Sequence, residues 1–213
     1  MKAVIFDLDG TLIDSLGVWE GIDHKFLTGR GIAVPEDIGR IVKNMSLAES
    51  AEYFISRFSL NYSVDELIKI WNEMAYEEYA ENIPLKPGVR AYLLELSARR
   101  LKLAVATASE RRLVEAVLAR HALLPLFHTI VTVSEVGKGK GQPDIFLRAA
   151  SLMEVEPEGC LVFEDSLHGV IGAKKAGMKV WGVYDPWSAH ERLDIEQIAD
   201  RYIDSFLELE GDK

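Results

Sequence analysis

The sequence predicts an α/β fold, a doubly wound parallel sheet that carries an inserted all-helical domain. Short apolar runs that do not alternate with polar residues recur along the chain, which is typical of strands covered on both faces. Segments with apolar residues at helical spacing separate the later runs, so helices join consecutive strands and the strands lie parallel. The gap between the first run and the second is too long for one crossover helix, which indicates an insertion there.

Five apolar runs are the expected strands of the sheet. In chain order they cover residues 3–6, 101–106, 129–133, 161–163 and 180–183. The helices expected between the later strands are one over 88–99 opened by Pro87-Gly88, one capped by Ser109, one over 144–153, and one capped by Ser166 and ended by Gly177. The pattern leaves the order of the strands in the sheet open.

The insertion has a helical pattern throughout. Asp14 or Ser15 is expected to open its first helix. Two further helices are indicated by the capping-box patterns Ser46-x-x-Glu49 and Ser63-x-x-Glu66, each followed by apolar residues at helical spacing.

The domain boundaries follow from the place of the insertion. We expect residues 16–84 to form a helical domain, and residues 1–15 and 85–213 to form the α/β domain. Trp19 and Trp71 are interpreted as core residues of the helical domain, because large apolar side chains are usually buried.

The composition is that of a globular chain with an acidic surface. With 213 residues, 48% of them apolar, it is long enough to bury a core without disulfides, and Cys160 is its only cysteine. Its 34 acidic residues against 24 basic ones argue against non-specific binding to nucleic acid. No apolar run approaches the ~20 residues of a membrane span, and the N-terminus lacks a secretory pattern. We therefore expect a cytoplasmic monomer that binds neither nucleic acid nor membranes.

Polar side chains stand where several expected strands end. They are Asp7 and Asp9 after the first strand, Thr107 after the second, Lys140 in the loop after the third, and Glu164 and Asp165 after the fourth. Any one of them alone is typical of a helix cap. Because ligands of open α/β sheets bind at the carboxyl ends of the strands, four such loops together predict a site at that edge.

The residue types in these loops favour phosphoryl transfer. Converging carboxylates repel one another, so a cation must lie among them, and Mg²⁺ prefers such oxygen ligands. Thr107, the amides at the helix start near Ser109, and Lys140 are expected to hold phosphate oxygens. One carboxylate can attack phosphorus to form an aspartyl-phosphate, and a second, two residues away, can protonate the leaving alcohol and later deprotonate water.

Four segments resemble, in the same order, the motifs of the haloacid dehalogenase superfamily. They are Asp7-Leu8-Asp9-Gly10-Thr11, Val105-Ala106-Thr107-Ala108-Ser109, Lys140-Gly141-Gln142-Pro143-Asp144 and Phe163-Glu164-Asp165-Ser166. The insertion is similar to the helical cap of the subgroup that contains β-phosphoglucomutase and small sugar-phosphate phosphatases. The resemblance implies a Rossmann-like core with this cap, and a hydrolase of the phosphatase type.

The resemblance also implies a role for each site residue. Asp7 is the expected nucleophile and a Mg²⁺ ligand, and Asp9 is the expected general acid/base, whose backbone carbonyl also binds the metal. Asp165 is expected to be a metal ligand, and Glu164 is expected to be a metal ligand or the partner of one. Thr107, Ala108 and Lys140 are the expected phosphate-binding residues, and Lys140 also neutralises charge.

The chain departs from the family pattern at two places. Gly141 stands where the family usually has proline after the lysine. The register to Pro143-Asp144 selects Lys140, and Lys138, two residues upstream, is the alternative. Trp19 and Leu47 align with the histidine and the cap arginine of the mutase, which favours a phosphatase. A flat wall against a sugar or apolar substrate is the alternative to the interpretation of Trp19 as a core residue.

The expected function is a Mg²⁺-dependent phosphatase that hydrolyses a small organic phosphate monoester, a sugar or polyol phosphate, through an aspartyl-phosphate. A phosphomutase of the β-phosphoglucomutase type is the alternative. The reaction of a haloacid dehalogenase needs neither Asp9 nor a metal ligand at Asp165, which argues against that activity. A phospho-accepting receiver carries its aspartate after a middle strand and has no inserted cap.

Overall fold

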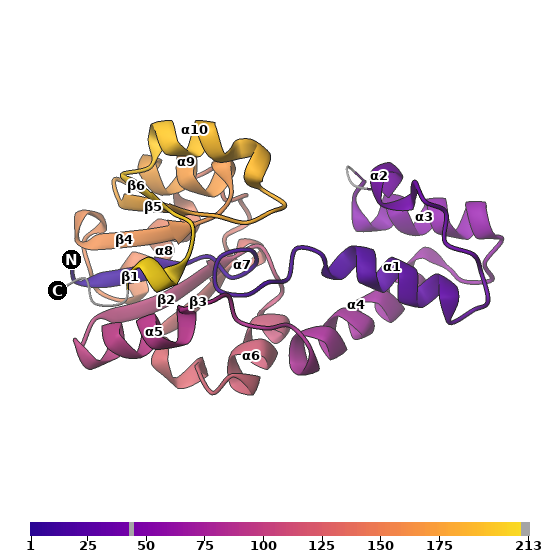
Figure 1. Ribbon diagram of the computed structural model, residues 1–213, viewed down its shortest axis with the longest axis horizontal. Helices are drawn as coiled ribbons and strands as arrows, with labels where there is room; N and C mark the ends of the chain where they lie inside the picture. Colours follow the sequence, from indigo (N-terminus) through magenta and orange to yellow (C-terminus); the bar gives the residue numbers. More distant parts are fainter. Residues whose placement is uncertain (43–44, 210–213) are drawn as a thin grey trace. The chain divides into compact units, whose positions relative to one another are not determined.

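The computed structural model describes residues 1–42 and 45–209 of the chain (Figure 1). The chain divides into two compact units, one formed by Met1–Leu16 with Ile83–Lys213 and the other by Gly17–Asn82. The first unit contains a parallel sheet between layers of helices, and the second is helical. The predicted fold class, a doubly wound parallel sheet with an all-helical insertion, is confirmed.

In the described residues the sheet has six strands, all parallel, in the order β3-β2-β1-β4-β5-β6. They are β1 (Ala3–Phe6), β2 (Lys102–Thr107), β3 (Thr129–Thr132), β4 (Cys160–Glu164), β5 (Lys179–Val183) and β6 (Arg201–Ile203). The sequence analysis missed β6, because its three residues at the edge of the sheet include only one buried side chain. Phe6 pairs with Phe163 across β1 and β4, so Asp7 and Glu164 lie at the same level on neighbouring strands.

Helices cover both faces of this sheet. They are α5 (Val89–Ala98), α6 (Arg111–Arg120), α7 (Val133–Val136), α8 (Asp144–Leu152), α9 (Leu167–Lys175) and α10 (Arg192–Ile198), with short 3-10 helices at Leu124–Leu126, Pro157–Gly159, Ala189–Glu191 and Phe206–Leu209. Alternate strand residues face opposite layers, because side chains in a strand point alternately up and down. Ile5 belongs to the core cluster that contains Phe146 of α8 and Val170 of α9, whereas Phe6 contacts Phe206 on the other face.

Two expected helix caps in this unit have different outcomes. Ser166 caps α9 by accepting the Gly169 N–H, and Gly177 follows that helix with the left-handed φ of 79°. The expectation that Ser109 caps the next helix is wrong, because α6 begins after Glu110. The Ser109 hydroxyl instead donates to Asp9.

The helical unit contains α1 (Val18–Thr28), α2 (Ile38–Val42), α3 (Leu47–Phe58) and α4 (Val64–Glu81). Both predicted capping boxes are present, with the backbone N–H of Ser46 and of Ser63 donating to the glutamate three residues later at 2.7 and 2.8 Å. The expectation that Asp14 or Ser15 opens the first helix is wrong, because α1 starts at Val18 after Gly17.

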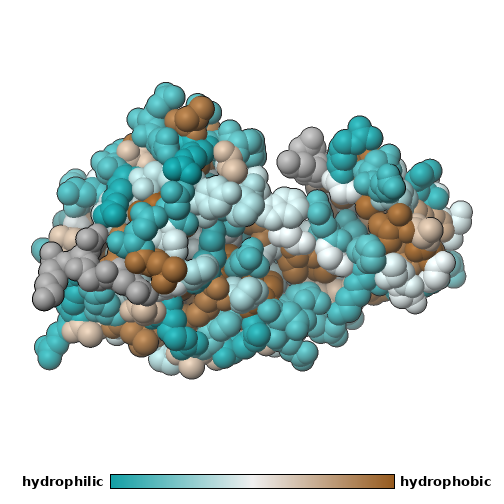
Figure 2. All heavy atoms as spheres, in the orientation of Figure 1, coloured by the Kyte–Doolittle hydropathy of each residue, from teal (hydrophilic) through white to brown (hydrophobic). Residues whose placement is uncertain are grey.

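The core of the helical unit is aromatic. Trp71 packs edge-on against Phe26 and Phe54, with ring centroids 5.9 and 5.0 Å away, which confirms its interpretation as a core residue. Trp19 is 40% exposed, so the same interpretation is wrong for Trp19. A helix long and apolar enough to cross a membrane does not occur among the described residues. Figure 2 shows hydrophilic residues over much of the visible face of each unit, with apolar areas between them.

Candidate active site

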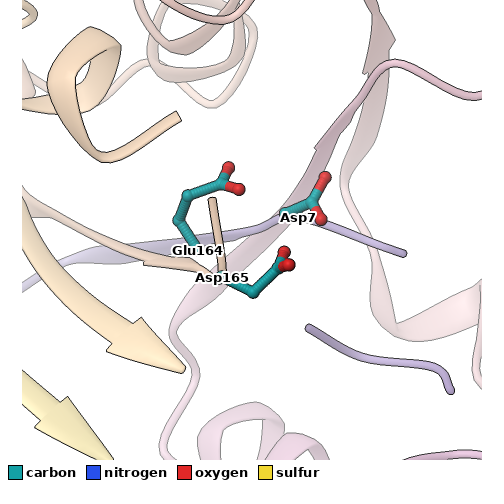
Figure 3. A group of neighbouring side chains, drawn as sticks. All are labelled: Asp7, Glu164 and Asp165. Carbon is teal, nitrogen blue, oxygen red and sulfur yellow. The ribbon is translucent and has the colours of Figure 1, made fainter. Parts of the chain in front are cut away.

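Asp7, Glu164 and Asp165 form a buried acidic cluster at the carboxyl ends of β1 and β4. Each contributes one carboxylate oxygen to a set of atoms that all lie within 4.8 Å of one another. Figure 3 shows the three side chains directed into the same space. The strand that follows β1 in the chain, β2, lies on one side of the β1–β4 pair, and the strand that follows β4, β5, lies on the other side. The direction of the connections therefore reverses between β1 and β4, and open α/β sheets bind ligands at such a point.

Lys140 brings a positive charge into the cluster from the loop before α8. Its Nζ lies 2.5 Å from Asp7 Oδ1 and also forms an ion pair with Glu164. Lys138 instead pairs with Asp144 at 2.7 Å on the surface. Of the two lysines that the sequence left open, the structure therefore brings Lys140 to the acidic residues, although Gly141 replaces the usual proline.

Helix α9 supports the loop that carries Lys140. A Cβ atom at Gly172 would overlap the Lys140 carbonyl oxygen, so only glycine lets the loop pass this close to the helix. Lys175, one turn further on, donates to the Gly141 carbonyl at 2.9 Å. Sequence reasoning missed both residues, and the glycine inside a predicted helix is the signal that could have found Gly172.

Asp9 lies two residues after Asp7 but has a different environment. Ser15 donates to Asp9 Oδ1 at 2.7 Å, and Ser109 donates to Oδ2 at 2.6 Å. Thr107 also donates to Oδ2, at 3.4 Å. These hydroxyl groups hold the Asp9 carboxylate toward the end of β2. The sequence predicted that Asp9 and Thr107 would come together, but it missed Ser15 and gave Ser109 a different role.

The turn after β2 contains the other expected phosphate-binding residues. The Thr107 side chain is buried, and its Oγ1 accepts the Ser109 N–H at 3.0 Å. Ala108 lies exposed between them. The structure thus places Thr107 beside Asp9 and leaves Ala108 at the surface of this turn.

Asp165 is held by the loop that follows β1. Thr11 donates to Asp165 Oδ1 at 3.2 Å. Gly10 has a φ of 81°, and a Cβ atom there would lie 2.6 Å from Asp165 Oδ2. A residue with a side chain would therefore collide with the carboxylate and strain the backbone.

Burial dominates the electrostatics of the cluster. It raises the pKa of Asp7 well above the usual range, against the effect of Lys140. Burial, followed by the charge of Glu164, raises the pKa of Asp165 to about 7. Burial would lower the pKa of Lys140, but the carboxylates of Asp7 and Glu164 outweigh it and raise that pKa. Lys140 therefore stays charged and only partly offsets the three acids.

The donor set fits a divalent metal ion. The cluster offers oxygen ligands from three carboxylates, of which one ammonium group balances only part of the charge. Mg²⁺ is a hard cation that prefers carboxylate oxygens together with water and phosphate oxygens. Asp7, Glu164 and Asp165 are the residues of this chain that would hold it.

The fold and the acidic cluster together define the class: an α/β protein with a buried group of carboxylates at the carboxyl edge of its parallel sheet. Residues 4–183 match the model of the haloacid dehalogenase-like hydrolases, and the chain belongs to this family. The membership of this family that the four sequence motifs predicted is thereby confirmed.

The chain is also similar to individual members of the family. It is 32% identical over 184 residues to the phosphorylated carbohydrates phosphatase of Thermotoga maritima, covering 86% of this chain and 85% of that protein. It is 32% identical over its full 213 residues to the bifunctional riboflavin kinase/FMN phosphatase of Arabidopsis thaliana, of which it spans 55%. A crystal structure of a candidate β-phosphoglucomutase from Thermotoga maritima superposes with a TM-score of 0.83 at 29% identity, over 95% of this chain and 94% of that one. The chain is a hydrolase of the phosphatase type.

Proposed function

We propose that this protein is a Mg²⁺-dependent phosphatase that hydrolyses a sugar phosphate, a polyol phosphate or a similar small phosphate monoester. The observation that carries the proposal is the buried Asp7 carboxylate, which lies beside Glu164 and Asp165 with Lys140 Nζ 2.5 Å from its Oδ1. The similarity to a phosphatase of phosphorylated carbohydrates supports the substrate class.

In the first half of the reaction Asp7 is the nucleophile. One of its carboxylate oxygens attacks phosphorus, the bond between phosphorus and the leaving oxygen breaks, and an aspartyl-phosphate forms. Lys140 holds Oδ1 and so limits rotation of the carboxylate. Asp9, which Ser15 and Ser109 hold in one orientation, donates a proton to the leaving alcohol.

In the second half of the reaction water hydrolyses the aspartyl-phosphate. Asp9, now ionised, takes a proton from the water as it attacks phosphorus, and the Asp7 carboxylate leaves. Thr107 and Lys140 bind phosphate oxygens. When bound, Mg²⁺ supplies positive charge to the phosphate oxygens in the transition state.

We further propose that the helical unit is a cap that selects the substrate, with residues 16–84 as cap and residues 1–15 and 85–213 as core. Its support is the division of the chain into two compact units at nearly the same positions. The motif residues all belong to the α/β unit, so the groups that distinguish one phosphate ester from another are assigned to the helical unit.

A phosphomutase is the second candidate, because of the similarity to a β-phosphoglucomutase structure. The two residues aligned with the mutase histidine and cap arginine argue against it. Trp19 is an exposed indole, and Leu47 packs against the apolar core of the helical unit. Neither side chain can take a proton from a sugar hydroxyl or bind a second phosphate as a cation.

The test is a panel of small phosphate esters, assayed for inorganic phosphate with Mg²⁺ and with EDTA. We expect Mg²⁺-dependent release from sugar or polyol phosphates, and a loss of several orders of magnitude in Asp7→Asn, which keeps the shape of the side chain without its attacking charge. Release that is unchanged in Asp7→Asn would contradict the assigned nucleophile. Isomerised product that retains its phosphate would identify a mutase.

A further inference from the structure

Lys86 is a buried lysine that the reaction scheme does not use. It lies where the chain has returned from the helical unit, and its side chain is 12% exposed. Its Nζ donates to the Gly10 carbonyl at 2.6 Å, to the Tyr184 carbonyl at 2.5 Å and to Asp185 Oδ2 at 3.0 Å. The Asp185 side chain is fully buried, so the two charges balance each other inside the protein.

The backbone around Lys86 is paired with the loop that follows β1. The Lys86 N–H donates to the Leu12 carbonyl at 3.0 Å, and the Asp14 N–H donates to the Pro84 carbonyl at 3.1 Å. The Lys86 side chain therefore extends from a fixed base, and its ammonium group lies between the loop after β1 and the loop after β5.

The position of the Gly10 peptide affects two carboxylates of the site, Asp9 and Asp165. Gly10 directly follows Asp9, and its Cα packs so closely against Asp165 that a Cβ atom would lie 2.6 Å from the carboxylate. A shift of the Gly10 peptide would therefore move Asp9 along the chain and change the space that Asp165 occupies.

The cost of burial makes a purely stabilising role a weak explanation for the pair. Two charges lose their hydration when they are buried, and well-packed apolar residues often replace such a pair without loss of stability. A role in fixing the backbone accounts for the position of the ammonium group better, since two of its three acceptors are backbone carbonyls in the loops after β1 and β5.

We propose that Lys86, with Asp185 as its counter-charge, is a positioning residue for the site: it holds the Gly10 carbonyl and thereby fixes Asp9 and Asp165 for the reaction. This inference rests on the proposed phosphatase function. Lys86 acts through the backbone of the loop after β1 and does not touch the reacting atoms.

The test compares kcat and KM in four variants for the sugar phosphate that the panel identifies, because its alkoxide leaving group needs the proton of a correctly placed Asp9. Lys86→Met with Asp185→Asn removes both charges together, so that neither is left buried alone. Lys86→Arg keeps the charge but presents its donors in a planar fork that does not match the same three acceptors. Asp185→Asn alone leaves the two carbonyl contacts of Lys86 in place. Lys174→Met with Asp200→Asn is the matched control, because this ion pair of 3.0 Å lies in the same unit and outside the site.

We expect kcat per folded molecule to fall on the order of 10- to 100-fold in the double Lys86 variant, the cost of a small misplacement of reacting groups, with a much smaller change in KM. Lys86→Arg should lower kcat as well, and Asp185→Asn should lower it less than either. The control pair should keep the wild-type kcat. Circular dichroism and thermal unfolding give the folded fraction of each variant.

A folded Lys86 variant, either the double variant or Lys86→Arg, with kcat within about twofold of the wild type would overturn the inference. A fall in kcat that merely follows the melting temperature across all four variants would also overturn it, because that is the result of a structural role. Asp7→Asn separates the two proposals. If it retains activity, the proposed function fails, whereas an inactive Asp7→Asn beside a fully active double variant rejects the Lys86 inference alone.

Discussion

Asp7 and Asp9 are separated by one residue, yet their neighbours differ in kind. Asp7 lies among carboxylates beside the Lys140 ammonium, whereas Asp9 accepts hydrogen bonds from serine and threonine hydroxyls. The charged surroundings suit a group that attacks phosphorus beside a metal ion. The hydroxyl groups suit one that must keep a single orientation while it gains and loses a proton.

The acid role of Asp9 can be separated from its other contacts by the choice of leaving group. Asp9→Asn should lower kcat on a sugar phosphate on the order of 10²- to 10⁴-fold, because its alkoxide needs a proton. The loss on p-nitrophenyl phosphate should be much smaller, because a phenolate leaves without one. Ser15→Ala, which removes one hydrogen bond to Asp9, is the control and should cost less on both substrates. Equal losses of Asp9→Asn on both substrates would contradict the acid role.

Asp165 should make the stability of the metal-free protein depend on pH. Burial, followed by Glu164, raises its pKa from 3.8 to about 7 in the folded protein. The folded state therefore binds more protons than the unfolded state between these values. The contribution of Asp165 to the free energy of unfolding is therefore complete below about pH 4 and is lost as the pH rises toward 7, by up to a few kcal/mol.

Thermal unfolding at pH 5 and pH 8, in EDTA and in Mg²⁺, measures this dependence. We expect a lower melting temperature at pH 8 than at pH 5 in EDTA, and a larger stabilisation by Mg²⁺ at pH 8, because the metal competes with the Asp165 proton. Asp165→Asn should weaken both effects. Equal stabilisation by Mg²⁺ at the two pH values would argue against Asp165 as a ligand.

At the scale of elements, helix α9 supports two groups of the site. Ser166, its N-cap, donates through its hydroxyl to Glu164 Oε1 at 2.8 Å, and its backbone N–H donates to the same oxygen at 3.2 Å. Gly172, further along the helix, lies against the Lys140 carbonyl. One short helix thus fixes the acid at the end of β4 and the loop that carries the lysine.

Gly172→Ala tests this support. The added methyl group must displace the Lys140 loop or the helix, so we expect a loss of about 1–3 kcal/mol in stability together with a lower kcat. Gly139→Ala is the matched control in the same loop, because a Cβ atom there meets nothing within 4 Å. Urea unfolding and assays with p-nitrophenyl phosphate measure the two effects. A Gly172→Ala variant as stable and active as Gly139→Ala would contradict the support.

At the scale of the whole molecule, the chain leaves the α/β unit after Leu16 and returns at Ile83. The acidic cluster of Asp7, Glu164 and Asp165 lies outside the segment between these points, and so do Thr107 and Lys140. This position supports our proposal that the α/β unit carries the chemistry and the helical unit selects the substrate.

Trp19→Ala tests this division of labour. Because Trp19 is 40% exposed on α1, its truncation should leave the helical unit folded while it changes KM and the ranking of phosphate esters. Activation by Mg²⁺ and inhibition by beryllium fluoride should stay unchanged, since both depend on the α/β unit. Trp187→Ala, 41% exposed in the α/β unit, is the control and should keep the ranking. An unchanged ranking in Trp19→Ala would count against a substrate-selecting role.

The linkers give a second measure of the same proposal. If the helical unit closes over a bound phosphate, hydrogen exchange near residues 14–17 and 82–88 should slow when Mg²⁺ and a phosphate analogue are both present. Unchanged exchange in both segments would leave the unit with a purely structural role.

Local sequence was enough to place most elements and the four site loops. Capping boxes at Ser46 and Ser63, the Ser166 cap and the buried strands are set by neighbours within a few residues, so spacing alone reveals them. The loop residues followed from a rule of parallel sheets, that strand ends share one edge. The core interpretation of Trp19 and the cap role of Ser109 were wrong. A large apolar side chain on a helix is sometimes exposed, and a serine hydroxyl near a helix start can bind a distant side chain instead of the helix backbone.

Tertiary structure alone decided the strand order, the edge strand β6 and the position of Lys86. The sequence already favoured Lys140, and the structure pairs Lys138 with Asp144 instead. Lys140 reaches Asp7 across 133 positions of the chain, and Lys86 reaches Asp185 across 99. Contacts of this kind depend on which strands pair and on how closely α9 approaches the loop that carries Lys140. Neither can be predicted from a short-range sequence pattern. The physical reason is that a buried charge is stable only where opposite charges and hydrogen-bond partners converge, and here they converge only after distant segments have packed together.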